Sequence, residues 1–357
     1  MSRDEVCIKV DKRAGEKMRR FLTGRSLLDP ARKIMAGGAS VCIPVCRCLS
    51  AEELEAAGRI AGVEIEICRE KLPEHKKKLG DLSDLLKDVI PAELLPQLPR
   101  SHDLVGDILL LESLQAALLP YKAEIGSALL KLNPGVTTIL LKTGSVEGEF
   151  RIPQLEVIAG AKKFETIHKE YGVNIKVDLS KAYFSPRLGY ERRRVAMSIS
   201  DGETVVDMFA GVGPFSLMIA KKAKTRIYSI DLNPDAILLL KENIPINRLR
   251  GEIVPICGDA KEVAKMLHGV ADHVIMNLPA SSLEFLDAAY RFLKKSGGTI
   301  HLYMFSGSSL EEVEAQFIDA SKNMYGEFAV KGSRVVKPVA PRKWQIALDI
   351  EVKTPAE

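Results

Sequence analysis

The sequence predicts an α/β protein in which two smaller N-terminal α/β units precede a Rossmann-like domain with a doubly wound parallel sheet. From about residue 186 onward, short apolar runs alternate with segments of helical spacing, which is the pattern of parallel strands joined by crossover helices. The chain has 357 residues, more than one hydrophobic core normally supports, so we expect several domains. Apolar residues make up 46% of the sequence, which is enough for ordinary cores and argues against a disordered chain.

The first unit is expected to cover residues 1–70. Residues 6–10 alternate between apolar and polar side chains like a strand, and residues 12–22 have the spacing of an amphipathic helix. Further strands are predicted over residues 40–46 and 63–68. These elements indicate a small α/β unit.

The second unit is expected to cover residues 71–178 and to begin with a linker rich in lysine, aspartate and proline. One buried strand, interrupted by a glycine, is predicted over residues 104–111. A helix over 122–132 and a strand over 137–142 follow. A Tyr-Gly pair between two strand-like runs in residues 164–177 indicates a β-hairpin.

The third unit, residues 179–357, carries the alternating pattern. Helices are predicted over residues 191–200, 214–222, 234–244, 261–267 and 283–293. Strands are predicted over residues 204–207, 226–231, 252–257, 273–276 and 298–304, with a closing hairpin from two more around 328–336 and 344–352. The alternation predicts a parallel sheet covered by helices on both faces.

Charge and composition restrict the kind of partner and the location. The net charge of +4 is mildly basic, which suits a phosphate-bearing partner without requiring one. No apolar run is long enough to span a bilayer, so we expect a soluble cytoplasmic protein without membrane contact. We also expect it to act as a monomer.

Six cysteines are present, and Cys42, Cys46 and Cys48 lie close together in the sequence. Their spacing is not that of a zinc site, because no paired CxxC motif accompanies them. We therefore expect free, partly buried thiols and no metal ion.

The strongest local motif begins at Asp207, where a strand runs into a turn containing Gly211 and Gly213. Pro214 follows at the position where a helix should start. The two glycines let the backbone approach a ligand at the carboxyl end of the strand, where sheets of this kind bind their ligands. The next strand ends in Asp231, at a spacing suited to binding the two hydroxyls of a ribose.

A dinucleotide site would share these features, but two differences argue against one. The turn lacks a third glycine, since Ser216 stands in its place, and Asp207 would crowd a pyrophosphate while suiting an ammonium group. The third strand ends at Gly258 and Asp259, which can accept a hydrogen bond from an adenine amine. A ligand with a cation, a ribose and an adenine fits these acids, and S-adenosylmethionine is such a ligand. The alternative is that the acids cap the following helices.

The fourth strand is followed by Asn277, Leu278 and Pro279. An asparagine side chain offers both a hydrogen-bond acceptor and a donor, which suits an amide-containing base such as guanine. A simple strand-ending turn is the alternative interpretation.

Several motifs together make the chain resemble one family over nearly its whole length. They are Asp103-Leu-Val-Gly-Asp107, Gly148-Glu-Phe-Arg151, Thr166-Ile-His-Lys-Glu170, Phe184-Ser-Pro-Arg-Leu-Gly-Tyr-Glu191, residues 207–215, Asn277-Leu-Pro279, Ala340-Pro-Arg342 and Leu348-Asp349. With these motifs the sequence resembles the archaeal branch of the archaeal and eukaryotic tRNA (guanine-37 N1) methyltransferases. The resemblance implies a class I methyltransferase domain that uses S-adenosylmethionine. It also implies two smaller domains that contact the outer corner of tRNA and its anticodon loop.

The resemblance also implies roles for individual residues. Glu191 would be the general base that takes the proton from guanine N1, Arg151 would contact the guanine, and Asn277 would orient it. The expected cofactor-binding residues are Asp207, Phe209, Gly211, Gly213, Asp231, Leu232, Gly258, Asp259 and Asn277. The expected substrate-binding residues are Tyr183, Pro186, Arg187 and Pro279. Tyr183 and Phe184 could stack on a flipped base, although core packing is an equal alternative for Phe184.

Other interpretations remain open. Glu191 could pair only with the three arginines that follow it, and Arg151 could be structural. A relative in the wyosine pathway would modify a tricyclic base at the same tRNA position, by methyl or aminocarboxypropyl transfer. A non-catalytic RNA-binding protein could retain the fold, but the acids at positions 207, 231 and 259 argue against it.

Overall fold

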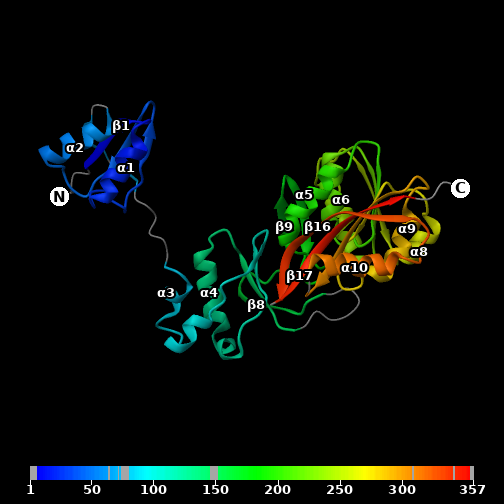
Figure 1. The fold of residues 1–357 in the computed structure, drawn as a ribbon. Helices are drawn as coiled ribbons and strands as arrows, with labels where there is room; N and C mark the ends of the chain where they lie inside the picture. Colours follow the sequence, from blue (N-terminus) through cyan, green and yellow to red (C-terminus); the bar gives the residue numbers. More distant parts are fainter. Residues whose placement is uncertain are drawn as a thin grey trace. The chain divides into compact units, whose positions relative to one another are not determined.

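A computed structural model describes residues 6–62, 65–70, 72–73, 80–144, 152–307, 309–340 and 342–353. Contacts within the chain divide it into two compact units, Met1–Gly80 and Asp81–Glu357. Figure 1 shows the fold of each unit. Whether the larger unit divides again at residue 178, as the sequence suggests, stays a prediction.

The N-terminal unit is a four-stranded sheet in the order β2-β3-β1-β4, with helices packed against one face. Its elements are β1 (Val6–Asp11), α1 (Gly15–Gly24), β2 (Met35–Gly37), β3 (Ser40–Pro44), α2 (Ala51–Ala61) and β4 (Glu66–Arg69). Ile8 and Ile43 point toward the helices and are fully buried. Ser50 and Glu53 form a capping box that starts α2.

The larger unit begins with a second four-stranded sheet, in the order β5-β6-β7-β8. Its strands are β5 (Asp103–Val105), β6 (Ile108–Leu111), β7 (Thr138–Lys142) and β8 (Leu155–Gly160). Its helices are α3 (Leu82–Leu86), η1 (Ala92–Gln97), η2 (Ala116–Tyr121) and α4 (Lys122–Leu132). A separate apolar core joins these helices to the strands.

The single strand predicted over residues 104–111 is wrong. The segment is instead a tight antiparallel hairpin of β5 and β6, in which Asp103 pairs with Leu110. Gly106 adopts a left-handed φ of 57° at the turn, and a Cβ atom there would lie 2.1 Å from the Thr166 hydroxyl. Asp107 stabilises the turn, because its carboxylate accepts hydrogen bonds from Thr166 and Lys163. The apolar residues on both sides of Gly106 and Asp107 therefore concealed a reversal of the chain.

The predicted hairpin is confirmed as β9 (Glu165–Glu170) and β10 (Val173–Asp178). Tyr171 and Gly172 both have positive φ angles at its turn. Val173, Ile175 and Val177 face the apolar core of the following domain. The hairpin is thus packed onto the domain that holds the candidate site.

The C-terminal sheet has seven strands in the order β13-β12-β11-β14-β15-β17-β16, of which β11–β15 are parallel. The strands are β11 (Thr204–Asp207), β12 (Arg226–Asp231), β13 (Glu252–Cys257), β14 (His273–Met276), β15 (Gly298–Ser306), β16 (Glu327–Ala340) and β17 (Lys343–Lys353). The helices are η3 (Pro186–Leu188), α5 (Gly189–Ser198), α6 (Pro214–Lys222), α7 (Pro234–Asn243), α8 (Ala260–Met266), η4 (Ser282–Phe285), α9 (Leu286–Phe292) and α10 (Leu310–Ser321). The predicted doubly wound sheet is confirmed.

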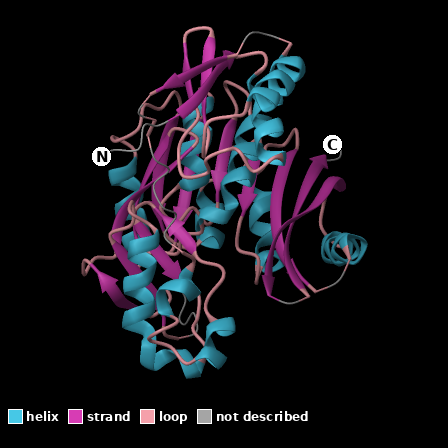
Figure 2. Cartoon of the chain, turned by 90° about the vertical axis from the view of Figure 1, so that its left-hand side faces the viewer, coloured by secondary structure: helices cyan, strands magenta, loops and turns pink. Residues whose placement is uncertain are grey.

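Alternate residues of the parallel strands serve two cores, one on each face of the sheet. Val205 packs with α5, α6 and α7, whereas its neighbour Val206 packs with α8, α9 and α10. Figure 1 shows α5 and α6 grouped apart from α8 and α9. The closing hairpin of β16 and β17 is also confirmed, with β17 inserted between β15 and β16 and leading to the C-terminus (Figure 2). In the described ranges, no helix combines the length and apolar character needed to cross a membrane.

Candidate active site

The predicted site residues lie at the carboxyl edge of the parallel strands. β11 is central, with β12 on one side and β14 on the other, so the direction of strand order reverses there. Such a reversal opens a crevice at the carboxyl edge of the sheet, where ligands bind. Asp207 ends β11, Asp231 ends β12, Asp259 lies just beyond β13, and Asn277 directly follows β14. The structure therefore brings these four residues to the same edge.

The loop after β11 depends on two left-handed glycines. Gly211 has φ 54° and Gly213 has φ 82°, a region that other residues rarely adopt. A Cβ atom on Gly213 would also lie 2.2 Å from a methyl carbon of Leu240. Pro214 then starts α6, so the loop ends at a helix N-terminus. The result is a tight turn whose backbone is open to close approach by a ligand.

Asp207 is fully buried and has an unused acceptor atom. Its Oδ2 accepts a hydrogen bond of 2.8 Å from Ser216, but its Oδ1 has no partner among the residues that the structure describes. Burial raises the pKa of Asp207 to about 7, and the nearby Asp231 carboxylate adds to the rise. A buried carboxylate oxygen without a partner fits a cationic ligand, such as the ammonium group of S-adenosylmethionine.

Asp231 connects the second strand to the glycine loop. Its two oxygens accept hydrogen bonds from the backbone N–H groups of Gly211, at 2.6 Å, and Asn233, at 2.9 Å. Each carboxylate oxygen has two lone pairs, so capacity remains for the hydroxyls of a ribose. Burial raises the pKa of Asp231 as well.

The remaining expected cofactor residues lie at the same edge of the sheet. Phe209 is half-buried and packs edge-on against Phe285, with ring centroids 5.0 Å apart, and Leu232 is 40% exposed. Gly258 leads into Asp259, which is exposed and accepts a hydrogen bond from the Lys261 N–H at the start of α8. Asp259 therefore caps α8, as the alternative interpretation predicted. The second oxygen of its carboxylate could still contact an adenine.

Asn277 is held in one orientation by a side chain from β17. Its Oδ1 accepts a hydrogen bond of 3.2 Å from the buried Gln345 amide, which leaves the Asn277 N–H groups to donate to a ligand. The Pro279 carbonyl accepts a hydrogen bond from the Phe305 N–H on β15. Two hydrogen bonds, to β17 and to β15, thus fix the segment to the sheet.

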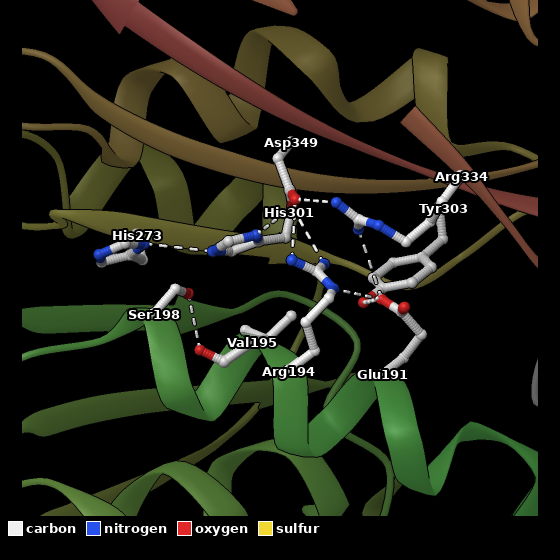
Figure 3. A network of polar contacts seen from close by, with 9 residues as sticks. All are labelled: Glu191, Arg194, Val195, Ser198, His273, His301, Tyr303, Arg334 and Asp349. Atoms are coloured by element: carbon white, nitrogen blue, oxygen red, sulfur yellow. Dashed lines mark hydrogen bonds and ion pairs between the residues drawn. The ribbon is translucent and has the colours of Figure 1, made fainter. Parts of the chain in front are cut away.

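Glu191 lies in the first turn of α5 and is only 3% exposed. Its carboxylate accepts hydrogen bonds from Arg194 at 2.9 Å and from the Tyr303 hydroxyl at 3.2 Å. Arg334 is also within ion-pair distance, at 3.7 Å. Figure 3 shows these three side chains converging on Glu191.

The three arginines after Glu191 have different partners. Arg192 binds Glu170, Arg193 stacks over the ring of Tyr171, and only Arg194 reaches Glu191. The alternative in which all three arginines pair with Glu191 is therefore wrong. Proximity in sequence misled because successive helical residues point in different directions.

Asp349 shares the arginines with Glu191 (Figure 3). It accepts two hydrogen bonds from Arg194, at 2.8 and 3.1 Å, and others from Arg334 and His301. Burial opposes ionisation, but these bonds outweigh it and hold the pKa of Asp349 well below its ordinary value. Two carboxylates thus balance two guanidinium groups, and neither arginine belongs to Glu191 alone.

Tyr303 is the second donor to Glu191 and is fully buried on β15. Burial, together with the adjacent Glu191 carboxylate, raises the pKa of Tyr303 well above its usual range. The hydroxyl therefore keeps its proton and remains a donor. The sequence did not point to Tyr303, Arg334 or Gln345, which contact Glu191 or Asn277, because each occupies an ordinary strand position. Asp349 was noted only as part of a motif.

The other expected substrate residues occupy the segment before α5. Tyr183 is half-exposed, whereas Phe184 is buried against His168 and Arg192, which favours core packing for Phe184. Pro186 starts η3, and Arg187 forms an ion pair of 2.6 Å with Asp103 on β5. Arg151 lies outside the described residues.

This arrangement defines a class of protein. The order of the seven strands, with one antiparallel strand inserted beside the last parallel one, is that of class I methyltransferases. The glycine loop and the acids that end the first two strands of the sheet occupy the cofactor edge of that fold.

Comparisons with known proteins agree with this class. The family models for the TRM5/TYW2 methyltransferase domain, the TYW2 N-terminal domain and the tRNA methyltransferase 5 N-terminal domain match residues 166–327, 82–163 and 7–51. The tRNA (guanine(37)-N(1))-methyltransferase Trm5b of Pyrococcus abyssi is 36% identical, with 97% of this chain and 99% of that protein covered. A solved complex of aTrm5 with tRNALeu is 34% identical and superposes with a TM-score of 0.71, covering 98% of this chain and 100% of that one.

A second kind of relative is also similar. The tRNA(Phe) (4-demethylwyosine(37)-C(7)) aminocarboxypropyltransferase of Methanocaldococcus jannaschii is 38% identical over 59% of this chain and 84% of that protein. The match to Trm5b of Pyrococcus abyssi includes the N-terminal unit, because it covers nearly the whole chain. The match to the aminocarboxypropyltransferase covers only part of the chain. The chain belongs to the TRM5/TYW2 methyltransferase family.

Proposed function

We propose that this protein transfers a methyl group from S-adenosylmethionine to N1 of the guanosine at position 37 of tRNA, next to the anticodon. The observation that supports it best is the position of Glu191 and Asn277. Asn277 directly follows Met276, which pairs with Leu302 on β15. Glu191 accepts a hydrogen bond from Tyr303, the residue after Leu302 on the same strand. A carboxylate and an amide therefore lie at the level where β14 ends, beside neighbouring residues of β15, at the edge that carries the predicted cofactor residues.

The chemistry requires a proton acceptor. Guanine N1 carries a proton and becomes nucleophilic only when that proton leaves, so a carboxylate at Glu191 can act as the general base. Negative charge then develops on guanine O6 and is stabilised by a hydrogen-bond donor. The family resemblance gives this role to Arg151. The Asn277 amide, which is fixed by a hydrogen bond from Gln345, orients the guanine. S-adenosylmethionine supplies the methyl group when bound.

Cofactor binding is assigned to the predicted residues at the carboxyl edge of the parallel strands. Asp207 would receive the ammonium group at its unpaired oxygen and Asp231 would receive the ribose, while the loop glycines allow close approach. The adenine would be surrounded by Phe209, Leu232, Gly258 and Asp259. Tyr183, Pro186, Arg187 and Pro279 would contact the nucleotide from the segments that flank the base.

The function is tested by mass spectrometry of nucleosides from tRNA transcripts treated with the protein and S-adenosylmethionine. A transcript with guanosine at position 37 should yield 1-methylguanosine, and one with adenosine there should yield no product. Adenine would present a lone pair, and not an N–H, to the Glu191 carboxylate, and an amine in place of the O6 that Arg151 would contact. An aminocarboxypropyl product would instead favour the wyosine-pathway alternative. Efficient methylation of adenosine would contradict the roles of Glu191 and Arg151.

Asp231→Ala should weaken binding of S-adenosylmethionine while leaving the fold intact. The loss of a charged acceptor for hydroxyl groups costs about 1.5–3 kcal/mol, or roughly 10- to 150-fold in the dissociation constant. Calorimetric titration measures this directly, and Asp235→Ala, on the exposed first turn of α7, is the matched control. An unchanged dissociation constant for Asp231→Ala would remove the residue from the site.

The N-terminal unit is proposed to contact the outer corner of tRNA, and the larger unit its anticodon loop. Removing residues 1–80 should therefore weaken binding of full-length tRNA more than binding of an anticodon stem-loop, as measured by filter binding. Equal losses for the two RNAs would show that the unit serves folding instead. The proposal also places the reaction in the cytoplasm and the protein as a monomer.

A further inference from the structure

Among the described residues of the N-terminal unit, the helices pack on one face of the sheet, and a group of thiols lies on the other. Ile8 and Val10 of β1 point toward α1 and α2, so their neighbour Cys7 points to the opposite face. There it joins Cys42, Cys68 and Leu72 in a small separate cluster. All three cysteines are free thiols.

The register of the strands brings the three thiols together from three different strands. Cys7 on β1 lies directly opposite Cys68 on β4, and their sulfur atoms are 2.6 Å apart. Cys42 on β3 is opposite Lys9, which makes it a diagonal neighbour of Cys7 on the same face. The three sulfur atoms all lie within 4.8 Å of one another. Their sequence separation explains why spacing alone did not reveal the group.

A carboxylate completes the set. Glu70 follows β4 directly, and its Oε2 lies 3.5 Å from the Cys42 sulfur. Glu70 is exposed, whereas Cys7 and Cys42 are buried. The group is therefore closed by protein on one side and open to solvent on the carboxylate side, which provides a path of entry.

We propose that Cys7, Cys42 and Cys68 bind a zinc ion, with the Glu70 carboxylate as the fourth ligand. Zinc in structural sites takes four ligands in a tetrahedron, most often with several cysteine sulfurs and at times a carboxylate oxygen. Three sulfur ligands exclude magnesium and calcium, which prefer oxygen. This inference concerns the N-terminal unit alone and does not depend on the methyl-transfer reaction.

Zinc binds the thiolate form of cysteine. On binding, each thiol forms a bond from sulfur to zinc and releases its proton to solvent.

A metal ion would also serve a structural need. The N-terminal unit has a small core, and a metal ion can add stability to a unit of this size. One ion would join β1, β3 and the end of β4 on the face opposite α1 and α2. A disulfide between Cys7 and Cys68 would join only two strands and would leave both Cys42 and Glu70 without a role.

The test is direct metal binding by the full-length chain. Protein purified without chelators should contain one zinc ion per chain by plasma mass spectrometry. The reduced, metal-free protein should bind Co²⁺ with the thiolate charge-transfer and visible bands of a tetrahedral sulfur-rich site. Cys42→Ser should lower cobalt affinity by more than the roughly 10–100-fold that outer-shell changes cause, while Cys48→Ser, an exposed cysteine outside the group, should leave it unchanged.

Glu70→Gln keeps the test independent of folding, because the side chain is exposed and its replacement has the same shape. It should retain the thiolate bands but bind cobalt more weakly. Three outcomes would overturn the proposal: no charge-transfer band in the reduced protein, equal affinity in Cys42→Ser and wild type, or a Cys7–Cys68 disulfide in protein purified anaerobically without reductant.

Discussion

Glu191→Gln is expected to lower the single-turnover rate of methyl transfer by about 100-fold or more, the usual range for loss of a general base. Glutamine keeps the shape of the side chain and can still accept a hydrogen bond from Arg194 or Tyr303, but it cannot take the proton from guanine N1. Binding of tRNA and S-adenosylmethionine should stay nearly unchanged. Rapid-quench measurements with enzyme in excess over tRNA isolate this step from product release.

The surroundings of Glu191 make this prediction demanding. Arg194 and the Tyr303 hydroxyl already donate hydrogen bonds to this carboxylate, and each occupies a lone pair that the guanine proton would otherwise use. Asp349 reduces this effect, since it takes two hydrogen bonds from Arg194 and one from Arg334. We therefore expect the arginines to position Glu191 without occupying it fully, so that the carboxylate can still receive a proton.

Two measurements distinguish a base from a structural ion-pair residue. The wild-type rate should fall on acidification, and this fall should disappear in Glu191→Gln. Glu262→Gln, in an exposed pair with Lys265, is the matched control and should behave like wild type. A Glu191→Gln protein with a near-normal rate and a lowered unfolding midpoint would mean that Glu191 is structural and that the base lies elsewhere.

Much of the cofactor edge could be predicted because it is encoded locally. A strand ending in Asp207, two glycines and a proline that starts a helix are contiguous, and strand-end acids at 231 and 259 follow from the alternating pattern. Parallel order then brings consecutive strand ends to one edge by topology alone. The ends of these strands could be recognised in the sequence because a helix follows each strand.

Residues that meet only through tertiary structure could not be predicted in the same way. Tyr303 is one apolar position among many in β15, and its contact with Glu191 joins residues 112 positions apart. Arg334 and Asp349 meet through the register of the closing hairpin, which the sequence does not specify in detail. The reversal at Gly106 was missed because short apolar segments flank it on both sides and resemble one strand with a glycine inside.

The ion pair of Arg192 and Glu170 is expected to carry the largest stability effect in the larger unit. Arg192 is 1% exposed and binds both carboxylate oxygens of Glu170, at 2.8 and 2.7 Å, while a third bond reaches the Ser185 carbonyl. These bonds fasten α5, which carries Glu191, to the end of β9. Arg192→Met would leave Glu170 buried and unpaired, and breaking a buried pair in this way costs about 3–5 kcal/mol.

Acid should act on the same pair. Burial raises the pKa of Glu170, but the hydrogen bonds from Arg192 and His168 outweigh it and hold the pKa at about 2. The folded value lies below the ordinary value of about 4.3. The pair therefore contributes fully above that pH, and its contribution is lost as the pH falls from there through about 2. The difference in unfolding free energy between wild type and Arg192→Met should shrink over this window.

Urea unfolding at neutral pH, followed by circular dichroism, gives the free energies. Arg226→Met, which removes one partner of an exposed pair with Glu252, is the matched control and should cost under about 1 kcal/mol. Replacing both partners, as Arg192→Met with Glu170→Met, should recover most of the loss, because no uncompensated charge then remains buried. If Arg192→Met costs no more than Arg226→Met, the pair does not hold α5 in place. The position of Glu191 would then have to come from Tyr303 and Arg194 alone.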